Sequence, residues 1–139
     1  MLYLAGKYSS QARLRAIRAR IRSQLGIECS SSWLDEKYES DEEATPETRA
    51  ENALRDLTEV LGADVFVIDT LDESATGGRE VEFGLALASM LPIALVGPRR
   101  NVFHYLGPVV QFDSWEAWFE EGERAGRELG YIGTTAEEL

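Results

Sequence analysis

Short apolar runs alternate along this chain with longer segments in which apolar residues recur at helical spacing. The apolar runs predict five buried strands, at residues 2–5, 27–33, 64–69, 92–96 and 108–112. The periodic segments predict four helices, at about residues 11–25, 46–61, 79–90 and 114–129. Residues 34–45 are acidic and polar, which is typical of a surface loop, and residues 134–139 are expected to be a frayed tail.

The order of these elements, β-α-β-α-β-α-β-β-α, is typical of a parallel sheet with helices on both faces. Because crossover connections are right-handed, few topologies remain. We expect a single α/β domain over residues 1–133, a doubly wound, flavodoxin-like or Rossmann-like sheet of five parallel strands in the order 2-1-3-4-5. Ligands of such sheets lie beyond the carboxyl ends of the strands, so functional residues should follow the first, third and fourth strands.

The apolar spacing also predicts which helix faces turn inward. In the second helix the inward residues are expected to be Ala50, Ala53, Leu54, Leu57 and Leu61. In the third helix they are expected to be Val81, Leu85 and Ala88. Asp56 borders the first of these stripes, and aspartate is a poor residue in the middle of a helix. It therefore has a partner, a task or a solvated face.

The charge balance narrows the classes of partner. The 139 residues include 14 basic and 25 acidic side chains, a net charge of −11. A nucleic acid polymer or an anionic membrane surface requires a basic footprint, so neither is expected, whereas a small-molecule ligand is. No stretch predicts a signal peptide or a membrane span. With one cysteine, Cys29, and one histidine, His104, we expect no intrachain disulfide, no metal site, no cofactor and a cytoplasmic location.

Candidate binding residues follow the predicted strands. Gly6, Lys7 and Tyr8 come after the first strand, and Asp69 ends the third. Thr76, Gly77 and Gly78 precede the third helix, where backbone N–H groups and the helix dipole suit a phosphate or a sugar hydroxyl. A plain turn also explains the two glycines.

Glu82 falls in the first turn of the third helix, at the flank of its buried stripe. The positive end of the helix favours an ionised carboxylate there, which suits a nucleophile. The other interpretation is a glutamate that serves only the helix dipole.

Three pieces of the chain together resemble a known family. They are Tyr3-Leu4-Ala5-Gly6 in the first strand, Asp56 in the helix ahead of Ala63-Asp64, and Glu82-Phe83-Gly84-Leu85-Ala86 after a glycine-rich turn. The pattern is similar to the nucleoside 2-deoxyribosyltransferase family, which includes the 2′-deoxynucleoside 5′-monophosphate N-glycosidases. The resemblance extends from Tyr3 to about Phe112.

The resemblance implies a role for each matched residue. Glu82 would be the nucleophile that attacks the anomeric carbon of a (deoxy)ribose and displaces the base, after which the glycosyl group passes to another base or to water. Asp56 would work beside it, and Tyr3 would orient its carboxylate. The loop of Gly6, Lys7 and Tyr8 would pack on the base. Asn101 matches an asparagine that reaches into a neighbouring subunit's site, which implies a homodimer or a larger homo-oligomer.

One position departs from the pattern of the transferases. Six residues before the nucleophile they carry an aspartate that helps protonate the base, and this chain has Thr76. The N-glycosidases carry a hydroxyl residue there that contacts phosphate, which favours a monophosphate substrate and hydrolysis over base exchange. The acid for the leaving base is then open among Asp69, Asp72 and Asp56. The alternative function is a non-catalytic nucleotide sensor or interaction module, which does not need Glu82.

Overall fold

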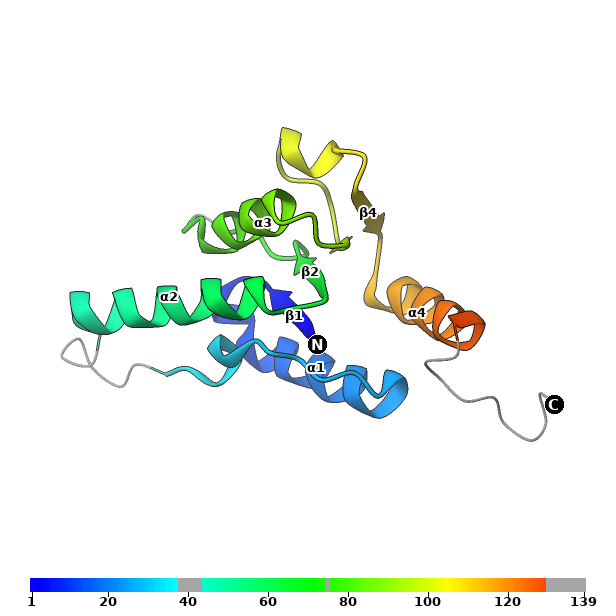
Figure 1. Ribbon diagram of the computed structural model, residues 1–139, viewed down its shortest axis with the longest axis horizontal. Coiled ribbons are helices and arrows are strands. Elements are labelled where there is room, and N and C mark those ends of the chain that lie inside the picture. Colours follow the sequence, from blue (N-terminus) through cyan, green and yellow to red (C-terminus); the bar gives the residue numbers. More distant parts are fainter. Residues whose placement is uncertain (38–43, 75, 130–139) are drawn as a thin grey trace.

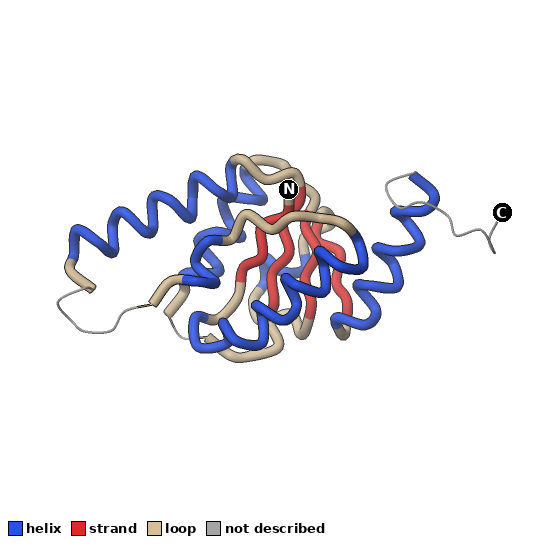
Figure 2. Tube along the Cα trace, turned by 90° about the horizontal axis from the view of Figure 1, so that it is seen from below, coloured by secondary structure: helices blue, strands red, loops and turns tan. Residues whose placement is uncertain are grey.

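Four parallel strands form the centre of the molecule. They are β1 (Leu2–Ala5), β2 (Val65–Asp69), β3 (Ile93–Val96) and β4 (Val109–Phe112), hydrogen-bonded in that order. The computed structural model describes residues 1–37, 44–74 and 76–129. Figure 2 shows the strands side by side within a shell of helices.

Four helices cover the two faces of the sheet. Helices α1 (Gln11–Leu25) and α4 (Trp115–Leu129) pack together on one face, and α2 (Pro46–Leu61) and α3 (Gly78–Ala88) pack together on the other (Figure 1). Three short 3₁₀ helices lie in the connections, η1 (Tyr8–Ser10), η2 (Ser32–Asp35) and η3 (Val102–Tyr105). The alternating α/β order and the parallel pairing confirm the predicted fold class.

The prediction of a fifth strand at residues 27–33 is wrong, and with it the five-stranded order 2-1-3-4-5. This segment makes a single parallel bridge, between Cys29 and Leu2. Beyond it, side chains replace the backbone ladder, because the Leu4 N–H donates to Ser31 Oγ (2.6 Å) and Trp33 Nε1 donates to the Leu4 carbonyl (2.8 Å). The chain then turns into η2. An apolar sequence alone did not reveal that two side chains occupy the edge of β1.

The second helix begins and ends where the sequence predicts. Pro46 is its first residue, and Thr45 Oγ1 accepts the N–H of Thr48 as an N-cap (3.2 Å). Such a cap contributes about 1 kcal/mol. Helix α2 runs from the left margin of Figure 1 towards the strands and packs against α3 and η2.

Most of the residues predicted to face inward on α2 and α3 are exposed, including Ala50, Ala53 and Ala88, and only Leu57 and Leu85 are half-buried. Leu54 and Leu61 are 67% and 59% exposed, and Val81 is 63% exposed. Val60 is the buried residue of α2, while the half-buried positions beside it include Asp56 and Glu59. In α3 the buried residues are Arg79, Phe83 and Ala86. Both helices therefore turn apolar side chains outward, and α2 turns carboxylates inward.

Candidate active site

Three elements each contribute one buried polar atom that has no hydrogen-bond partner among the described residues. These atoms are Tyr3 Oη on β1, Asp56 Oδ1 on α2 and Glu82 Oε2 on α3. Helix α3 packs against both β1 and α2, which brings the three side chains to one place. Tyr3 is fully buried, with its ring stacked on Phe66 at 5.8 Å between ring centres. Arg79 Nε, also on α3, is a fourth buried polar atom without a hydrogen-bond partner among the described residues. Buried polar groups in folded proteins are nearly always paired, so three such atoms in one place call for an explanation.

The electrostatics of this place follow from burial. The pKa of Glu82 is raised to about 7, mainly by burial, with a lowering contribution from the Tyr3 hydroxyl and smaller raising contributions from the carboxylates of Asp56 and Glu59. Burial and the nearby Glu82 carboxylate also raise the pKa of Tyr3, so its hydroxyl keeps its proton and can donate it to a ligand or to Glu82. The prediction that the helix end alone keeps Glu82 ionised omitted this burial, which has the opposite effect.

Asp56 is the second perturbed carboxylate. Its pKa is raised to about 6, mainly by burial, with the carboxylates of Glu36 and Glu59 acting in the same direction and Arg55 acting against them. Glu59 and Glu36, the two carboxylates near Asp56, have partners. Glu59 Oε1 accepts a hydrogen bond from the Ser32 hydroxyl (2.7 Å), and Glu36 Oε1 lies 3.4 Å from a guanidinium nitrogen of Arg55. Glu82 and Asp56 therefore stand at the centre of a carboxylate cluster of Glu36, Asp56, Glu59 and Glu82.

Glu36 and Glu59 are not among the candidate residues expected from the sequence. Glu59 lies three residues after Asp56 in α2, and residues with this spacing share one helix face. That spacing was the available signal.

The loop after β1 lies against the same region. A Cβ on Gly6 would stand 2.5 Å from Leu14 Cδ1, so glycine at this position lets α1 pack closely on β1. Lys7 precedes η1, and the hydroxyl of Tyr8 donates to the Glu36 carbonyl (2.9 Å). This bond ties the loop to the segment that carries Glu36. Gly6 thus has a packing role, and Tyr8, which is 44% exposed, keeps its ring accessible beside the cluster.

The turn before α3 is open to solvent. Gly77 has φ of 78°, a left-handed conformation that favours glycine, and no side chain caps the helix among the described residues. Gly78 is the first helical residue, four positions before Glu82. The exposed Thr76 hydroxyl lies 3.3 Å from the Ser74 hydroxyl. Thr76 and Gly78 are therefore exposed at the start of α3, the helix that carries Glu82.

Asp69 lies on the other face of the sheet and is fully engaged. Arg13 donates to both of its oxygens (2.8 and 3.0 Å), Trp115 Nε1 donates to Oδ2 (2.7 Å), and the Leu71 N–H donates to Oδ1 (3.1 Å). Asp72 accepts from Ser10 and Arg13. Of the three aspartates considered as the acid for the leaving base, only Asp56 adjoins Glu82 within the described residues.

Asn101 lies apart from the Glu82 cluster of its own chain. Its Oδ1 accepts the N–H of Phe103 and caps η3, and its Nδ2 donates to Glu80 Oε2 (3.1 Å). The same oxygen lies 2.9 Å from Nε2 of the buried His104. Because the Arg100 N–H donates to His104 Nδ1 (2.9 Å), the ring carries its proton on Nε2 and donates it to Glu80.

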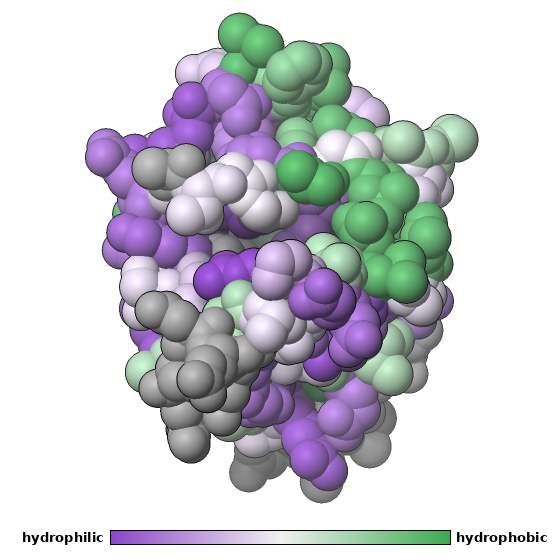
Figure 3. Space-filling model, turned by 90° about the vertical axis from the view of Figure 1, so that its left-hand side faces the viewer, coloured by the Kyte–Doolittle hydropathy of each residue, from purple (hydrophilic) through white to green (hydrophobic). Residues whose placement is uncertain are grey.

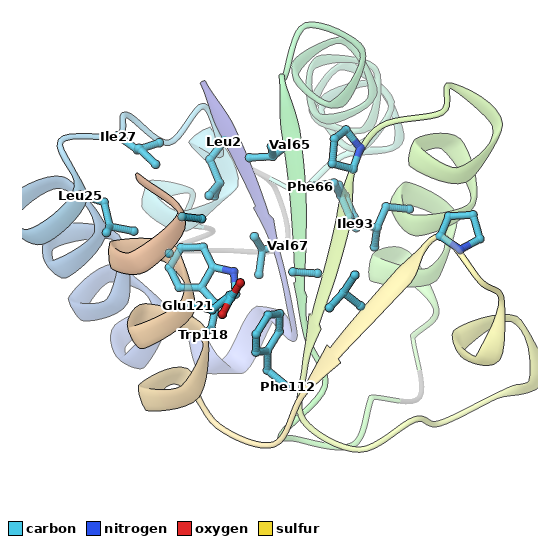
Figure 4. A pocket seen from close by; sticks show the side chains of 16 residues that line it. Leu2, Leu25, Ile27, Val65, Phe66, Val67, Ile93, Phe112, Trp118 and Glu121 are labelled. Atoms are coloured by element: carbon cyan, nitrogen blue, oxygen red, sulfur yellow. The ribbon is translucent and has the colours of Figure 1, made fainter. Parts of the chain in front are cut away.

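Two hollows lie away from Glu82. An apolar groove of about 440 Å³ separates α4 from the sheet, and Val67, Phe112 and Trp118 line it (Figure 4). A second hollow of about 890 Å³ lies between α3 and η3 and includes Asn101 and Phe103. Figure 3 shows hydrophobic surface gathered in the upper part of the face that it views.

The chain was compared with protein families, with curated proteins and with solved structures. No family model matches the chain, and no curated protein matches it in sequence. Its fold is similar to the solved structure of the Clostridium botulinum CMP N-glycosidase BcmB, with a TM-score of 0.54 and 15% sequence identity. The match covers 86% of this chain and 95% of that chain. The similarity is one of fold, and it puts an N-glycosidase on the same α/β architecture.

Two further findings concern the described residues alone. None of the helices there is long and apolar enough to cross a bilayer. Within the same residues, no group of three or more His, Cys, Asp or Glu side chains is arranged to hold a metal ion.

Proposed function

We propose that this protein is an enzyme that cleaves or transfers the N-glycosidic bond of a (deoxy)nucleoside or a nucleoside 5′-monophosphate. The observation that carries the proposal is the buried, unpartnered Glu82 Oε2, which lies with the Tyr3 hydroxyl and Asp56. Leaving such atoms unpaired costs stability, on the order of 1–3 kcal/mol each. A ligand that pairs with them would recover this cost. The fold of an enzyme that acts on CMP supports the same conclusion.

The mechanism begins with an ionised Glu82. Its carboxylate attacks the anomeric carbon, the bond from that carbon to the base breaks, and a glycosyl-enzyme ester forms through an oxocarbenium-like transition state. Tyr3, which is fully buried, holds the carboxylate in place by donating its hydroxyl proton. Water or an acceptor base then attacks the same carbon and releases Glu82. Asp56 is the neighbouring carboxylate that takes the proton of the incoming water.

The remaining candidates would bind the rest of the substrate. The loop of Gly6, Lys7 and Tyr8 would contact the base. The open turn of Thr76, Gly77 and Gly78 would accept a sugar hydroxyl or a 5′-phosphate through backbone N–H groups. A hydroxyl residue at position 76 favours hydrolysis and a monophosphate. Asp69 belongs to the stabilising network on the other face, and we do not assign it to the substrate.

We also propose that two copies of the chain form a homodimer through α3 and η3. Apolar side chains stand exposed on α3 and η3, with Val81 63%, Val102 76% and Phe103 60% exposed. Such patches mark interaction sites. Asn101 lies in the same hollow, so a homodimer formed through it would bring Asn101 to the partner. The variant Phe103→Glu should halve the mass measured by light scattering, and a monomeric wild-type protein would refute the dimer.

The function is tested by the release of free base. The purified protein is incubated with a panel of nucleosides and 5′-monophosphates, with and without an acceptor base, and the products are separated by chromatography. The variant Glu82→Gln should lower turnover on the order of 10³-fold or more, because it removes the nucleophile. The matched control Glu51→Gln makes the same change at an exposed position of α2 and should retain turnover. No release across the panel, or unchanged turnover in Glu82→Gln, would leave the binding-module alternative.

A further inference from the structure

Two arginine side chains hold the backbone of residues 69–72, the loop that begins at the end of β2. Arg79 Nη1, from α3, donates to the carbonyls of Asp69 (3.1 Å) and Asp72 (2.7 Å). Arg100 donates to the carbonyls of the two residues between them. Four consecutive carbonyls therefore accept hydrogen bonds from guanidinium groups, although water can satisfy the carbonyls of a surface loop.

The side chain of Asp72 connects this loop to η1 and α1. Its Oδ2 accepts from the Ser10 hydroxyl (2.6 Å) and from Arg13 Nη2 (2.9 Å). These two hydrogen bonds, first that of Ser10, hold the pKa of Asp72 below its usual value, so the carboxylate is ionised at neutral pH. Asp72 thus bonds through its carboxylate to η1 and through its carbonyl to Arg79 of α3.

These contacts join the two segments that the proposed function assigns to different parts of the substrate. Residues 6–8 lead directly into η1, to which Asp72 is bonded, and residues 76–78 lead directly into α3, which carries Arg79. Glu82 follows Arg79 by three residues and lies one helical turn further along α3. A shift of one segment relative to the other would therefore also shift the Glu82 carboxylate relative to a substrate that contacts both.

The burial of Arg79 indicates more than the stabilisation of a loop. The residue is 5% exposed, and its Nε has no hydrogen-bond partner among the described residues. The Glu80 carboxylate lies 3.7 Å from this nitrogen. Burying a guanidinium with an unpaired N–H costs stability, and a loop whose carbonyls bond to water does not require it. The fixed geometry of the loop is what this cost provides.

We propose, on the basis of the function proposed above, that Asp72 and Arg79 are positioning residues. They hold residues 6–8 at a fixed separation from residues 76–78 and from Glu82. A nucleotide can then contact both segments at once without first ordering them, with its anomeric carbon at the carboxylate. Preorganisation of this kind contributes to rate, and a displacement of about 1 Å can lower turnover on the order of 100-fold.

The first test weakens the connection at a solvent-accessible side chain. Asp72→Ala removes a carboxylate that is 46% exposed, so the fold should survive the change. Glu116→Ala is the matched control, because Glu116 also pairs with an arginine of α1, Arg20, but on the side of α4. For the 5′-monophosphate that releases its base fastest, we expect kcat/KM to fall about 10-fold or more in Asp72→Ala and to stay within about a factor of two in Glu116→Ala.

Fragments of the substrate distinguish a positioning role from a general loss of folded protein. Calorimetry is carried out on Glu82→Gln, with and without Asp72→Ala, using the monophosphate, its free base and the matching sugar 5-phosphate. Each fragment contacts one segment, so its affinity should change by less than about a factor of two, whereas the monophosphate, which contacts both, should bind about 10-fold more weakly. An equal loss for the fragments and the monophosphate would overturn the proposal.

A third measurement needs no substrate. The N–H groups of Glu80 and Val81 bond to the Gly77 carbonyl at the start of α3. Asp72→Ala should speed hydrogen exchange at these two amides about 10-fold, and Ser10→Ala, which removes only a hydroxyl of η1, should speed it about 3-fold. Glu116→Ala should leave it unchanged.

The outcomes distinguish this inference from the proposed function. Faster exchange at the start of α3, together with selective weakening of the monophosphate, supports the positioning role. Unchanged exchange in both variants, or unchanged kcat/KM in Asp72→Ala, overturns the positioning role and leaves the N-glycosidase function standing. No release of base by the wild-type protein overturns the function and the positioning role with it, even where exchange shows that the two segments are connected.

Discussion

Asp69 and Glu82 are both withdrawn from solvent in the same small domain, yet their surroundings differ completely. Asp69, on the α1 and α4 face, receives four hydrogen bonds, two of them from the guanidinium of Arg13. Glu82, on the α2 and α3 face, has an oxygen without a partner and further carboxylates around it. The first arrangement compensates the cost of burying a charge, and the second leaves that cost in place. One face of the sheet therefore supports the fold, and the other holds the carboxylate that we propose as the nucleophile.

The comparison is tested most strongly by Asp69→Asn. This substitution keeps the shape of the side chain and removes its charge, which leaves Arg13 without its main counterion. We expect the free energy of unfolding to fall by about 3 kcal/mol, because buried Asp69 loses its charge-assisted hydrogen bonds, while Arg13 is 38% exposed and keeps Asp72 as a partner. Urea unfolding followed by tryptophan fluorescence measures it. Asp64→Asn, at an aspartate whose side chain is 81% exposed, is the control and should change stability little. A stable Asp69→Asn protein would refute the distinction between the two faces.

The same chemical change at the other face should act in the opposite direction. Burial raises the pKa of Glu82 from 4.5 to about 7, so between these pH values the folded state holds a proton that the unfolded state has lost. Stability from this group therefore falls as pH rises from about 4.5 to 7 and is constant above that. Glu82→Gln should increase the free energy of unfolding at pH 8 by about 2–3 kcal/mol.

The pH dependence distinguishes this effect from improved packing. The advantage of Glu82→Gln should shrink below pH 7 and vanish below about pH 4.5, where both states of the wild-type protein are protonated. Urea titrations at several pH values would show it. A gain that is equal at pH 4 and pH 8, or a loss at both, would mean that Glu82 is as well accommodated as Asp69.

A smaller effect is expected at a neutral buried group that is fully paired. Ser31 is 1% exposed, and its hydroxyl oxygen accepts the N–H of Leu4 (2.6 Å). Ser31→Ala leaves that N–H without an acceptor and should lower the free energy of unfolding by about 1–2 kcal/mol. The same urea titration resolves this change, and Ser23→Ala, on an exposed part of α1, serves as the control. No change in Ser31→Ala would indicate that another acceptor replaces the hydroxyl.

Local patterns in the sequence were sufficient for much of the fold. The Thr45-Pro46 start of α2, the Gly77-Gly78 start of α3 and four of the five predicted strands depend on neighbouring residues, and the structure contains them. The fifth strand failed because Ser31 and Trp33 bond to β1 through side chains, which no periodicity reveals. The inward faces failed for a related reason, since α2 and α3 have apolar residues on more than one side.

Part of the candidate site could be predicted from the sequence. The positions of Tyr3, Asp56 and Glu82 were found through a family pattern, and the structure brings these three together. The hydrogen bonds of the Asp69 carboxylate could not be predicted from the sequence, because its partners Arg13 and Trp115 lie 56 and 46 residues away along the chain. Whether a carboxylate is paired depends on such distant contacts, so sequence alone did not separate a stabilising aspartate from a substrate-binding one.

The outer margin of β1 has a consequence for how the protein behaves at high concentration. At this margin, the backbone N–H and C=O groups of Leu2 and Leu4 are all hydrogen-bonded. Those of Leu2 bond to Glu28 and Ser30, and those of Leu4 bond to the side chains of Ser31 and Trp33. A strand from a misfolded neighbouring molecule could not pair with β1 at this margin, because the backbone groups that it would hydrogen-bond to are already occupied. The Trp33 indole and the Ser31 hydroxyl thus protect this edge of the sheet from amyloid-like strand addition.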